Sequence, residues 1–294
     1  MPPIVLACDQ NYAMPLATTL RSLVDSNQRH WPLDITILSD GFTDALKQRV
    51  LDSLPTGSVG VRWYPVDTAR YANYPLMPHH SRMTYARFQL EHVFGPEVRR
   101  VVYLDTDILV LGDLEELSKT PLGGAVLAAV PDDFVDTSIR AGIAANLVGV
   151  PQVARYFNAG ILVIDLDRWR RHEVARRSIE YMARFPNSPY SDQDGLNSAC
   201  DRTWAAIDKR WNFQQHLRVR IDDLADHERP AIVHFITGKK PWLPKSTSLN
   251  ATMYRRFRDR TQFREQPMER MMATLTTLSY RVARKGRRVA AQFR

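Results

Sequence analysis

Residues 101–110 read VVYLDTDILV, an apolar run that two carboxylates, Asp105 and Asp107, interrupt near its middle. Burying an unpaired carboxylate is costly, and the flanking residues are too apolar for an ordinary surface loop. A hard divalent cation such as Mn²⁺ or Mg²⁺ prefers oxygen ligands and would remove that cost. The stretch therefore predicts a buried strand over 101–104 that ends at a metal site. The alternative is a solvated loop with two chance acids.

Apolar runs and helical patterns alternate on both sides of this stretch. We expect strands at 4–7, 33–38, 58–66, 101–104, 125–130, 160–164 and 231–236, and helices at 15–23, 44–54, 85–94, 167–185 and 192–199. Strands that alternate with helices favour an α/β fold with a mixed, mostly parallel sheet covered on both faces. Ligands of such sheets bind beyond the carboxyl ends of the strands.

The composition is that of a globular protein. The chain has 294 residues, 44% hydrophobic and 24% charged, which predicts one large domain or two small ones and disfavours disorder. No apolar run approaches the roughly 20 residues of a membrane-spanning helix, and residues 1–9 look like a strand rather than a signal peptide. Two cysteines, Cys8 and Cys200, are too few for a disulfide framework. We expect a cytoplasmic protein, and 33 arginines against 7 lysines hint at a bacterial source.

The positive charge is concentrated at the C-terminus. The net charge is +8, and residues 253–294, with 12 Lys and Arg against 3 Asp and Glu, leave the rest of the chain almost neutral. A nucleic-acid-binding domain would carry its basic stripe on the body, so nucleic acid is not an expected partner. We expect a main domain over 1–250 and a basic amphipathic helix over 251–294 that lies on an anionic membrane surface. A solvated tail and an RNA-binding tail are the alternatives.

Further polar residues follow other expected strands. Asp9, Asn11 and Tyr12 come after the first strand, where they would bind and stack on a base or simply cap a helix; the dinucleotide motif Gly-x-Gly-x-x-Gly is absent. Asp192 and Gln193 begin a helix, where an acid is also favourable for the helix dipole. His234 and Lys240 follow the last strand as a further metal ligand and a phosphate partner, or as ordinary structural residues.

Six ordered segments together resemble glycosyltransferase family 8, which includes glycogenin and bacterial lipopolysaccharide galactosyl- and glucosyltransferases. They cover about residues 4–243 and read ACDQNYA (7–13), TYAR (84–87), VYLDTDILV (102–110), YFNAG (156–160), SDQD with LN (191–197), and HF with KPW (234–242). The resemblance is closest to the bacterial branch. It implies a single Rossmann-like domain of the GT-A type.

The resemblance also implies an activity. The enzyme would transfer glucose or galactose from a UDP-hexose, with retained configuration, to a saccharide or glycolipid acceptor such as lipopolysaccharide. It would use Mn²⁺, with Mg²⁺ as an alternative, and work peripherally on the inner face of the cell membrane. An alternative is a metal-dependent nucleotide-sugar hydrolase or nucleotidyltransferase, and a non-enzymatic basic nucleotide-binding protein is a third.

By position, the family's functional residues correspond to residues of this chain. The residues at the uracil and the start of the donor site are Ala7, Asp9, Asn11 and Tyr12. The metal ligands are Asp105, Asp107 and His234, and the residues at the diphosphate are Gly238 and Lys240. The residues at the sugar are Arg87, Asp132, Asn158, Asp192 and Gln193. Asp133 is an alternative to Asp132. Gln193 would stabilise the oxocarbenium-like state, with Asp192 and Arg87 beside it. The chain departs from the pattern at Thr237, where the family usually has glycine.

Overall fold

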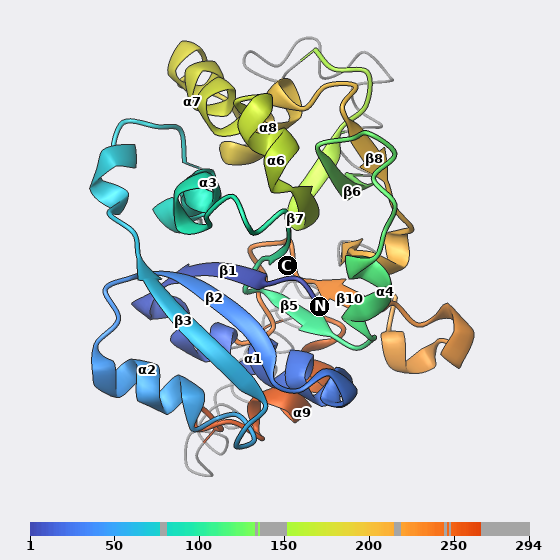
Figure 1. The fold of residues 1–294 in the computed structure, drawn as a ribbon. Coiled ribbons are helices and arrows are strands. Elements are labelled where there is room, and N and C mark those ends of the chain that lie inside the picture. The colour runs from blue at the N-terminus through green and yellow to red at the C-terminus, as the bar shows by residue number, and fades with distance from the viewer. Residues whose placement is uncertain are drawn as a thin grey trace, which may run out of the picture.

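A seven-stranded sheet with the order β3-β2-β1-β4-β7-β6-β8 forms the centre of the molecule (Figure 1). The computed structural model describes residues 1–76, 81–132, 135, 152–214, 219–243, 246 and 248–265. The strands are β1 (Ile4–Asp9), β2 (Leu33–Asp40), β3 (Val59–Pro65), β4 (Arg100–Leu104), β6 (Leu127–Pro131), β7 (Phe157–Asp165) and β8 (Trp204–Ala206). Neighbouring strands are parallel except at β7, so the predicted mixed, mostly parallel α/β sheet is confirmed.

The reversed direction of β7 determines which strand ends meet at one edge of the sheet. It is antiparallel to both β4 and β6, and Phe157 pairs with Pro131 at the end of β6. The amino end of β7, with Asn158, therefore lies at the same edge as the carboxyl ends of β1, β4 and β6. Side chains from four strands can meet there.

A second sheet of three short strands continues from β4. It has the order β5-β10-β9, with β5 (Ile108–Val110), β9 (Phe213–Gln214) and β10 (Ile232–His234). In the antiparallel pair of β5 and β10, His234 lies opposite Ile108. The pairing brings His234 next to the Asp105–Asp107 turn, although Asp107 lies 127 residues before His234 in the chain. Sequence analysis predicted β10 within the apolar run over 231–236 but neither β5 nor β9, because β9 has only two residues and β5 comes directly after the Asp105–Asp107 turn.

Helices cover both faces of the large sheet (Figure 1). One face packs on α1 (Ala13–Ser26), α2 (Asp44–Leu51) and α4 (Leu114–Ser118), and the other on α3 (Leu90–Val93), α6 (Leu166–Arg171), α7 (Val174–Arg184) and α8 (Asp192–Ala199). Short 3₁₀ helices lie at Gln10–Tyr12, Gln28–His30, Thr68–Tyr71, Arg82–Gln89, Lys209–Trp211, Ile221–Asp223 and Asp226–Glu228.

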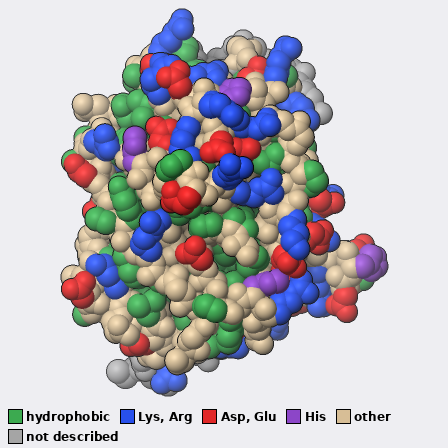
Figure 2. Space-filling model, in the orientation of Figure 1, with side chains coloured by type: hydrophobic (Ala, Val, Ile, Leu, Met, Phe, Trp, Pro, Cys, Tyr) green, Lys and Arg blue, Asp and Glu red, His purple; other side chains and the backbone are tan. Residues whose placement is uncertain are grey.

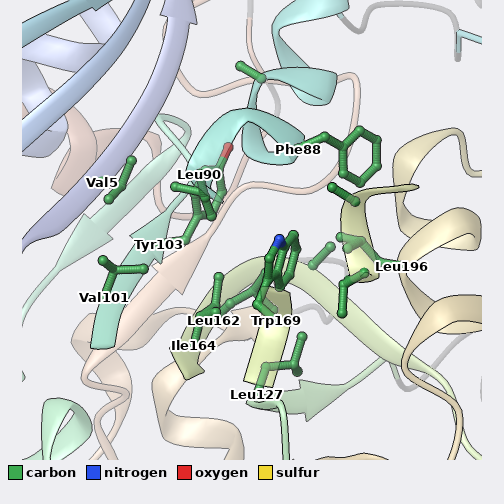
Figure 3. Close-up of a cluster of buried hydrophobic side chains, with 14 of the residues drawn as sticks. Val5, Phe88, Leu90, Val101, Tyr103, Leu127, Leu162, Ile164, Trp169 and Leu196 are labelled. Carbon is green, nitrogen blue, oxygen red and sulfur yellow. The ribbon is translucent and has the colours of Figure 1, made fainter. Parts of the chain in front are cut away.

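The strands are apolar on both sides because each face of the sheet has its own core. Along β1, Ile4 and Leu6 belong to the core under α1, whereas Val5 belongs to the opposite one. Figure 3 shows this second core, in which Val5, Val101 and Ile164 of the sheet pack with side chains from the covering helices. Such two-sided burial is the reason for the near-continuous apolar runs in the sequence.

Two predicted helices differ from the structure. The segment expected as a helix over 85–94 is a 3₁₀ helix over Arg82–Gln89 followed by the single turn of α3. The helix expected over 167–185 is broken between α6 and α7, where Glu173 adopts the left-handed conformation with φ 50°. An apolar pattern continues through both breaks, so periodicity alone does not reveal them.

The chain after residue 250 packs on the body. Helix α9 (Ala251–Arg258) lies against α1, and its Tyr254 is completely buried between Phe235 and Trp242. The amide of Gln262 donates to Ser53 Oγ at 3.0 Å. Residues 251–265 are thus part of the body, so any separate basic segment begins after Glu265. Residues 266–294, on which most of the expected membrane helix falls, lie outside the described part of the chain.

Candidate active site at the carboxyl edge of the sheet

Asp105, Asp107 and His234 come together although they are distant in sequence. The two acids occupy the turn between β4 and β5, and His234 ends β10. One atom of each lies within 4.8 Å of the others, and His234 Nε2 is 3.2 Å from Asp107 Oδ1 and 3.8 Å from Asp105 Oδ2. Two carboxylate oxygens and an imidazole nitrogen around one point suit a divalent cation. With Lys240, these three residues are called the acidic cluster below.

The two carboxylates have different electrostatic surroundings. Burial raises the pKa of Asp107, but Lys240, whose Nζ lies 2.5 Å from its Oδ2, and His234 outweigh burial and hold that pKa well below its usual range. Burial raises the pKa of Asp105; Arg87 opposes this, the neighbouring Asp107 adds to it, and the net shift is upward. Asp107 is therefore ionised without further help, whereas Asp105 gains most from an added cation.

Hydroxyl groups of α1 hold the strand that follows the acids. Thr19 Oγ1 lies 2.9 and 2.8 Å from the carbonyl oxygens of Thr106 and Ile108, on either side of Asp107. Ser22 Oγ accepts from the amide of Val110, and Ser26 Oγ donates to its carbonyl, both at 2.9 Å. These side chains satisfy the free edge of β5 in place of a neighbouring strand. Sequence analysis missed them, although their spacing along α1 places them on one helical face.

The 3₁₀ helix over 82–89 directs three side chains to the site. It has three residues per turn, so positions three apart lie on one line. Ser81 Oγ, at its N-cap, donates to Asp9, Thr84 Oγ1 donates to Asp192, and Arg87 follows three residues later. An α-helix over the same residues would spread these side chains around its axis, so the unexpected helix type has a direct effect on the site.

Arg87 connects Asp105 of the acidic cluster with Asp192 at the start of α8. Its Nη2 donates to Asp105 at 2.9 Å, and its Nε lies 3.1 Å from Asp192 Oδ2. The side chain is buried, which lowers the pKa of Arg87, but Tyr103, Asp192 and Asp105 raise it more, so the guanidinium stays charged. The sequence prediction that Arg87 and Asp192 act at one place is compatible with this geometry.

The residues after β1 line an adjoining pocket. Ala7, Asp9 and Tyr12 line a pocket of about 100 Å³ together with Asp105 and Asp107. A wider pocket of about 500 Å³, which also contains the exposed Asn11, shares Asp9 and Tyr12 with it. Tyr12 lies edge-on to Trp242, with ring centroids 5.8 Å apart. Burial, with a smaller contribution from Asp107, raises the pKa of Tyr12 to about 12, so it is a neutral aromatic surface.

Amide side chains form the other side of the site. Asn158 Nδ2 and Gln193 Nε2 donate to the same oxygen of Asp132, at 3.2 and 3.3 Å, and Gln193 Oε1 accepts from the amide of Ala159 at 3.0 Å. Asn158 Oδ1 accepts from the amides of Gly160 and of Asn212 Nδ2, at 3.0 and 2.8 Å. We call Asp132, Asn158, Gln193 and Asn212 the amide network. Asp133, the alternative to Asp132, lies outside the described residues.

Asn212 is a site residue that sequence analysis missed. It is buried between the 3₁₀ turn at Lys209–Trp211 and β9, and its Oδ1 lies 3.0 Å from His234 Nδ1. A lone neutral Asn between two aromatic residues, Trp211 and Phe213, belongs to no motif that would mark it as a site residue. Gly160 lies under the same ring: a Cβ there would be 2.2 Å from His234 Cε1. Glycine is therefore required where β7 passes the histidine.

Two further features complete the description of this region. Gly238 occupies an exposed turn with Thr237, whose Oγ1 accepts from the amide of Lys239 at 3.3 Å. A separate pocket of about 620 Å³ lies between α9 and the segment over 229–231 that precedes β10. It is lined in part by Arg229, Arg256 and Phe257 and contains none of the predicted site residues. On the face drawn in Figure 2, basic and acidic side chains are intermingled.

The fold and the polar edge of the sheet define a glycosyltransferase of the GT-A type. The chain belongs to glycosyl transferase family 8, whose model matches residues 3–246. It is 26% identical to general stress protein A of Bacillus subtilis, over 81% of this chain and 86% of the relative. It is 24% identical to the lipopolysaccharide 1,2-glucosyltransferase of Escherichia coli K12, over 81% of this chain and 72% of that protein.

A solved structure agrees with the fold. The galactosyltransferase LgtC, in complex with donor and acceptor sugar analogs, matches with a TM-score of 0.76 and 29% identity, over 92% of this chain and 99% of the other. Among the residues that our structure describes, no helix has the length and apolarity needed to cross a bilayer.

Proposed function

We propose that the protein is a retaining hexosyltransferase that uses a UDP-sugar, glucose or galactose, and a divalent metal, with Mn²⁺ the first candidate and Mg²⁺ the second. The observation that carries the proposal is the convergence of Asp105, Asp107, His234 and Lys240 beside a pocket lined by Asp9 and Tyr12. This arrangement suits a uracil base at one end and a diphosphate at the other.

The chain's own residues divide the work. Asp105, Asp107 and His234 would hold a divalent ion, whose positive charge would stabilise the departing diphosphate. Lys240 adds a cation at the same place once a phosphate oxygen displaces Asp107 as its partner. Arg87 and Asp192 hold the sugar end, and Asp132 and Asn158 offer hydrogen bonds to its hydroxyls. Gln193 lies within this network as the stabiliser of the oxocarbenium-like state.

The acceptor is a saccharide or a glycolipid, and lipopolysaccharide is the first candidate. This proposal is supported by the lipopolysaccharide glucosyltransferase among the relatives.

The test is a screen of UDP-glucose and UDP-galactose with Mn²⁺ and a panel of saccharide acceptors, with product stereochemistry read by NMR. We expect turnover that needs acceptor and metal and a product with the donor's α configuration. A β-linked product would contradict the retaining mechanism. Release of free hexose at the same rate with and without acceptor would favour the nucleotide-sugar hydrolase instead.

We also propose that the basic segment after Glu265 binds an anionic membrane surface on the cytoplasmic side. The support is its sequence pattern: Met271, Leu275, Leu278 and Val282 are spaced for one helical face, and residues 281–288 contain five Lys or Arg. Truncation after Thr274 is expected to abolish sedimentation with anionic vesicles at moderate salt while transfer to a soluble acceptor survives. Equal sedimentation of the truncated protein would contradict the proposal.

A further inference from the structure

The histidine of the acidic cluster has a fixed hydrogen-bond partner on the side away from the acids. His234 Nδ1 lies 3.0 Å from Asn212 Oδ1, and both side chains are at least 95% buried. A neutral imidazole binds a metal only through the nitrogen that lacks a proton, so the partner of Nδ1 decides whether Nε2 is available.

The polarity of the amide network settles which nitrogen carries the proton. The amide of Gly160 is a backbone donor, so the Asn158 atom that it contacts, at 3.0 Å, must be the oxygen. The other Asn158 atom, the nitrogen, then faces the carboxylate of Asp132 at 3.2 Å, which is an acceptor. Neither end of Asn158 can be exchanged without placing donor against donor or acceptor against acceptor.

The same reasoning passes one residue further. Asn212 contacts Asn158 Oδ1 at 2.8 Å, so the contacting atom must be its nitrogen, and its remaining atom, the oxygen, faces His234. An oxygen acceptor at Nδ1 requires a proton on Nδ1. The orientation, normally an assignment, is therefore fixed here by a backbone amide and a carboxylate.

We propose that Asn212 is a positioning residue that keeps a proton on Nδ1 of His234, so that Nε2, which faces Asp105 and Asp107, is the ring nitrogen left for a metal. The amide network thereby links the sugar side of the site to the metal side. This inference deepens the proposed function and rests on the assignment of His234 as a metal ligand.

The tautomer can be observed directly, without metal or substrate. Long-range ¹H–¹⁵N NMR of the metal-free protein at pH 8 reports which ring nitrogen of each histidine carries the proton, and His234→Gln identifies the signal. We expect a proton on Nδ1 of His234. The Nε2–H pattern, with Nδ1 unprotonated, would overturn the inference whether or not the protein proves to be a transferase.

Variants of Asn212 then separate positioning from folding. In Asn212→Leu, we expect His234 to change to the Nε2–H form, which donates to Asp107, and Mn²⁺ affinity, measured by electron paramagnetic resonance, to fall about 10- to 100-fold. Asn212→Asp loses the donor to Asn158 Oδ1 but retains an acceptor at Nδ1, so it should keep the proton on Nδ1 and most of the Mn²⁺ affinity. An unchanged tautomer and unchanged affinity in Asn212→Leu would overturn the inference.

Asn27→Leu is the matched control. Asn27 is a buried asparagine hydrogen-bonded at both ends, through Nδ2 to Leu23 O at 2.9 Å and through Oδ1 to the amide of Leu114 at 2.8 Å. Its loss should lower the unfolding temperature but leave the His234 signal in place. If wild type shows the Nδ1–H pattern but binds no Mn²⁺, the proposed metal use fails while the assignment of the tautomer stands.

Discussion

The acidic cluster and the amide network lie at the same edge of the sheet but are built in opposite ways. In the acidic cluster, Asp105 and Asp107 sit beside His234 and Lys240, so formal charges are concentrated with few neutral partners. In the amide network, almost every polar atom is matched by a neutral donor or acceptor, and Asp132 accepts from two amides. The acidic cluster is built for an external cation and phosphate, whereas the amide network is satisfied by itself and can hold geometry.

The largest effect is expected from breaking the acidic cluster. Asp107→Asn keeps the volume but removes the charge, and the loss of several kcal/mol of leaving-group stabilisation should lower the transfer rate about 10³-fold. Initial rates at saturating Mn²⁺ measure this. Asp222→Asn is the control, because it removes a carboxylate of the same type that pairs with Arg256 at 3.3 Å away from the site. Equal rates for Asp107→Asn and wild type would remove Asp107 from the metal site.

A buried acid next to the amide network should affect stability rather than chemistry. Asp194 accepts from Tyr156 Oη at 2.6 Å and from the amide of Tyr190 at 2.9 Å, and burial raises its pKa to about 6. The folded state then keeps a proton that the unfolded state loses near pH 4, so stability from this group is present below about pH 4 and is lost as the pH rises through 6. Its full loss is about 3 kcal/mol.

Comparison with Asp194→Asn isolates this contribution. The variant cannot ionise, so urea denaturation should show wild type losing stability relative to it between pH 4 and pH 7. A pH-independent difference between the two proteins would mean that Asp194 is charged throughout.

The same contrast explains which parts of the site the sequence could predict. Asp105 and Asp107 were predicted because carboxylates stand out in an apolar run. His234 and Lys240 were predicted because they follow the last expected strand and match family positions; the functional roles of all four remain proposals. Neutral residues give no such signal. Thr19 and Asn212 look like ordinary helix and loop residues. Their contacts, with the carbonyl oxygen of Thr106 and with His234 Nδ1, become visible only once β5 is paired with β10.

The fold was predictable for a related reason. Strands buried on both faces, such as β1, β2 and β4, carry strong apolar runs, whereas β8 and β9, with three and two residues, are too short to show a pattern. The 3₁₀ helix over Arg82–Gln89 was taken for an α-helix, although Ser81, Thr84 and Arg87, each three residues apart, were a usable signal. The packing of Tyr254 against Trp242 depends on tertiary contacts that no local pattern contains.

Within the amide network, Gln193→Ala tests whether neutral contacts control the reaction. The variant removes the donor to Asp132 and the acceptor for the amide of Ala159, so the sugar end should lose its alignment. We expect kcat to fall about 10- to 100-fold while Mn²⁺ affinity stays the same. A parallel loss of Mn²⁺ affinity would show that Gln193 also supports the metal side of the site, as is proposed for Asn212.

The smallest effect is expected at the pocket beside both clusters, where Tyr12 offers a neutral ring. Tyr12→Ala removes an aromatic stacking surface, so UDP binding should weaken by about 1–2 kcal/mol. Tyr12→Phe keeps the ring and should bind UDP almost as well as wild type, because its hydroxyl proton is not given up near neutral pH. Calorimetric titration of UDP in the presence of Mn²⁺ measures both variants. If Tyr12→Phe lost as much affinity as Tyr12→Ala, the hydroxyl rather than the ring would be the contact. If neither variant changed the affinity for UDP, Tyr12 would serve only to pack against Trp242, and the base would have to bind in another part of the site.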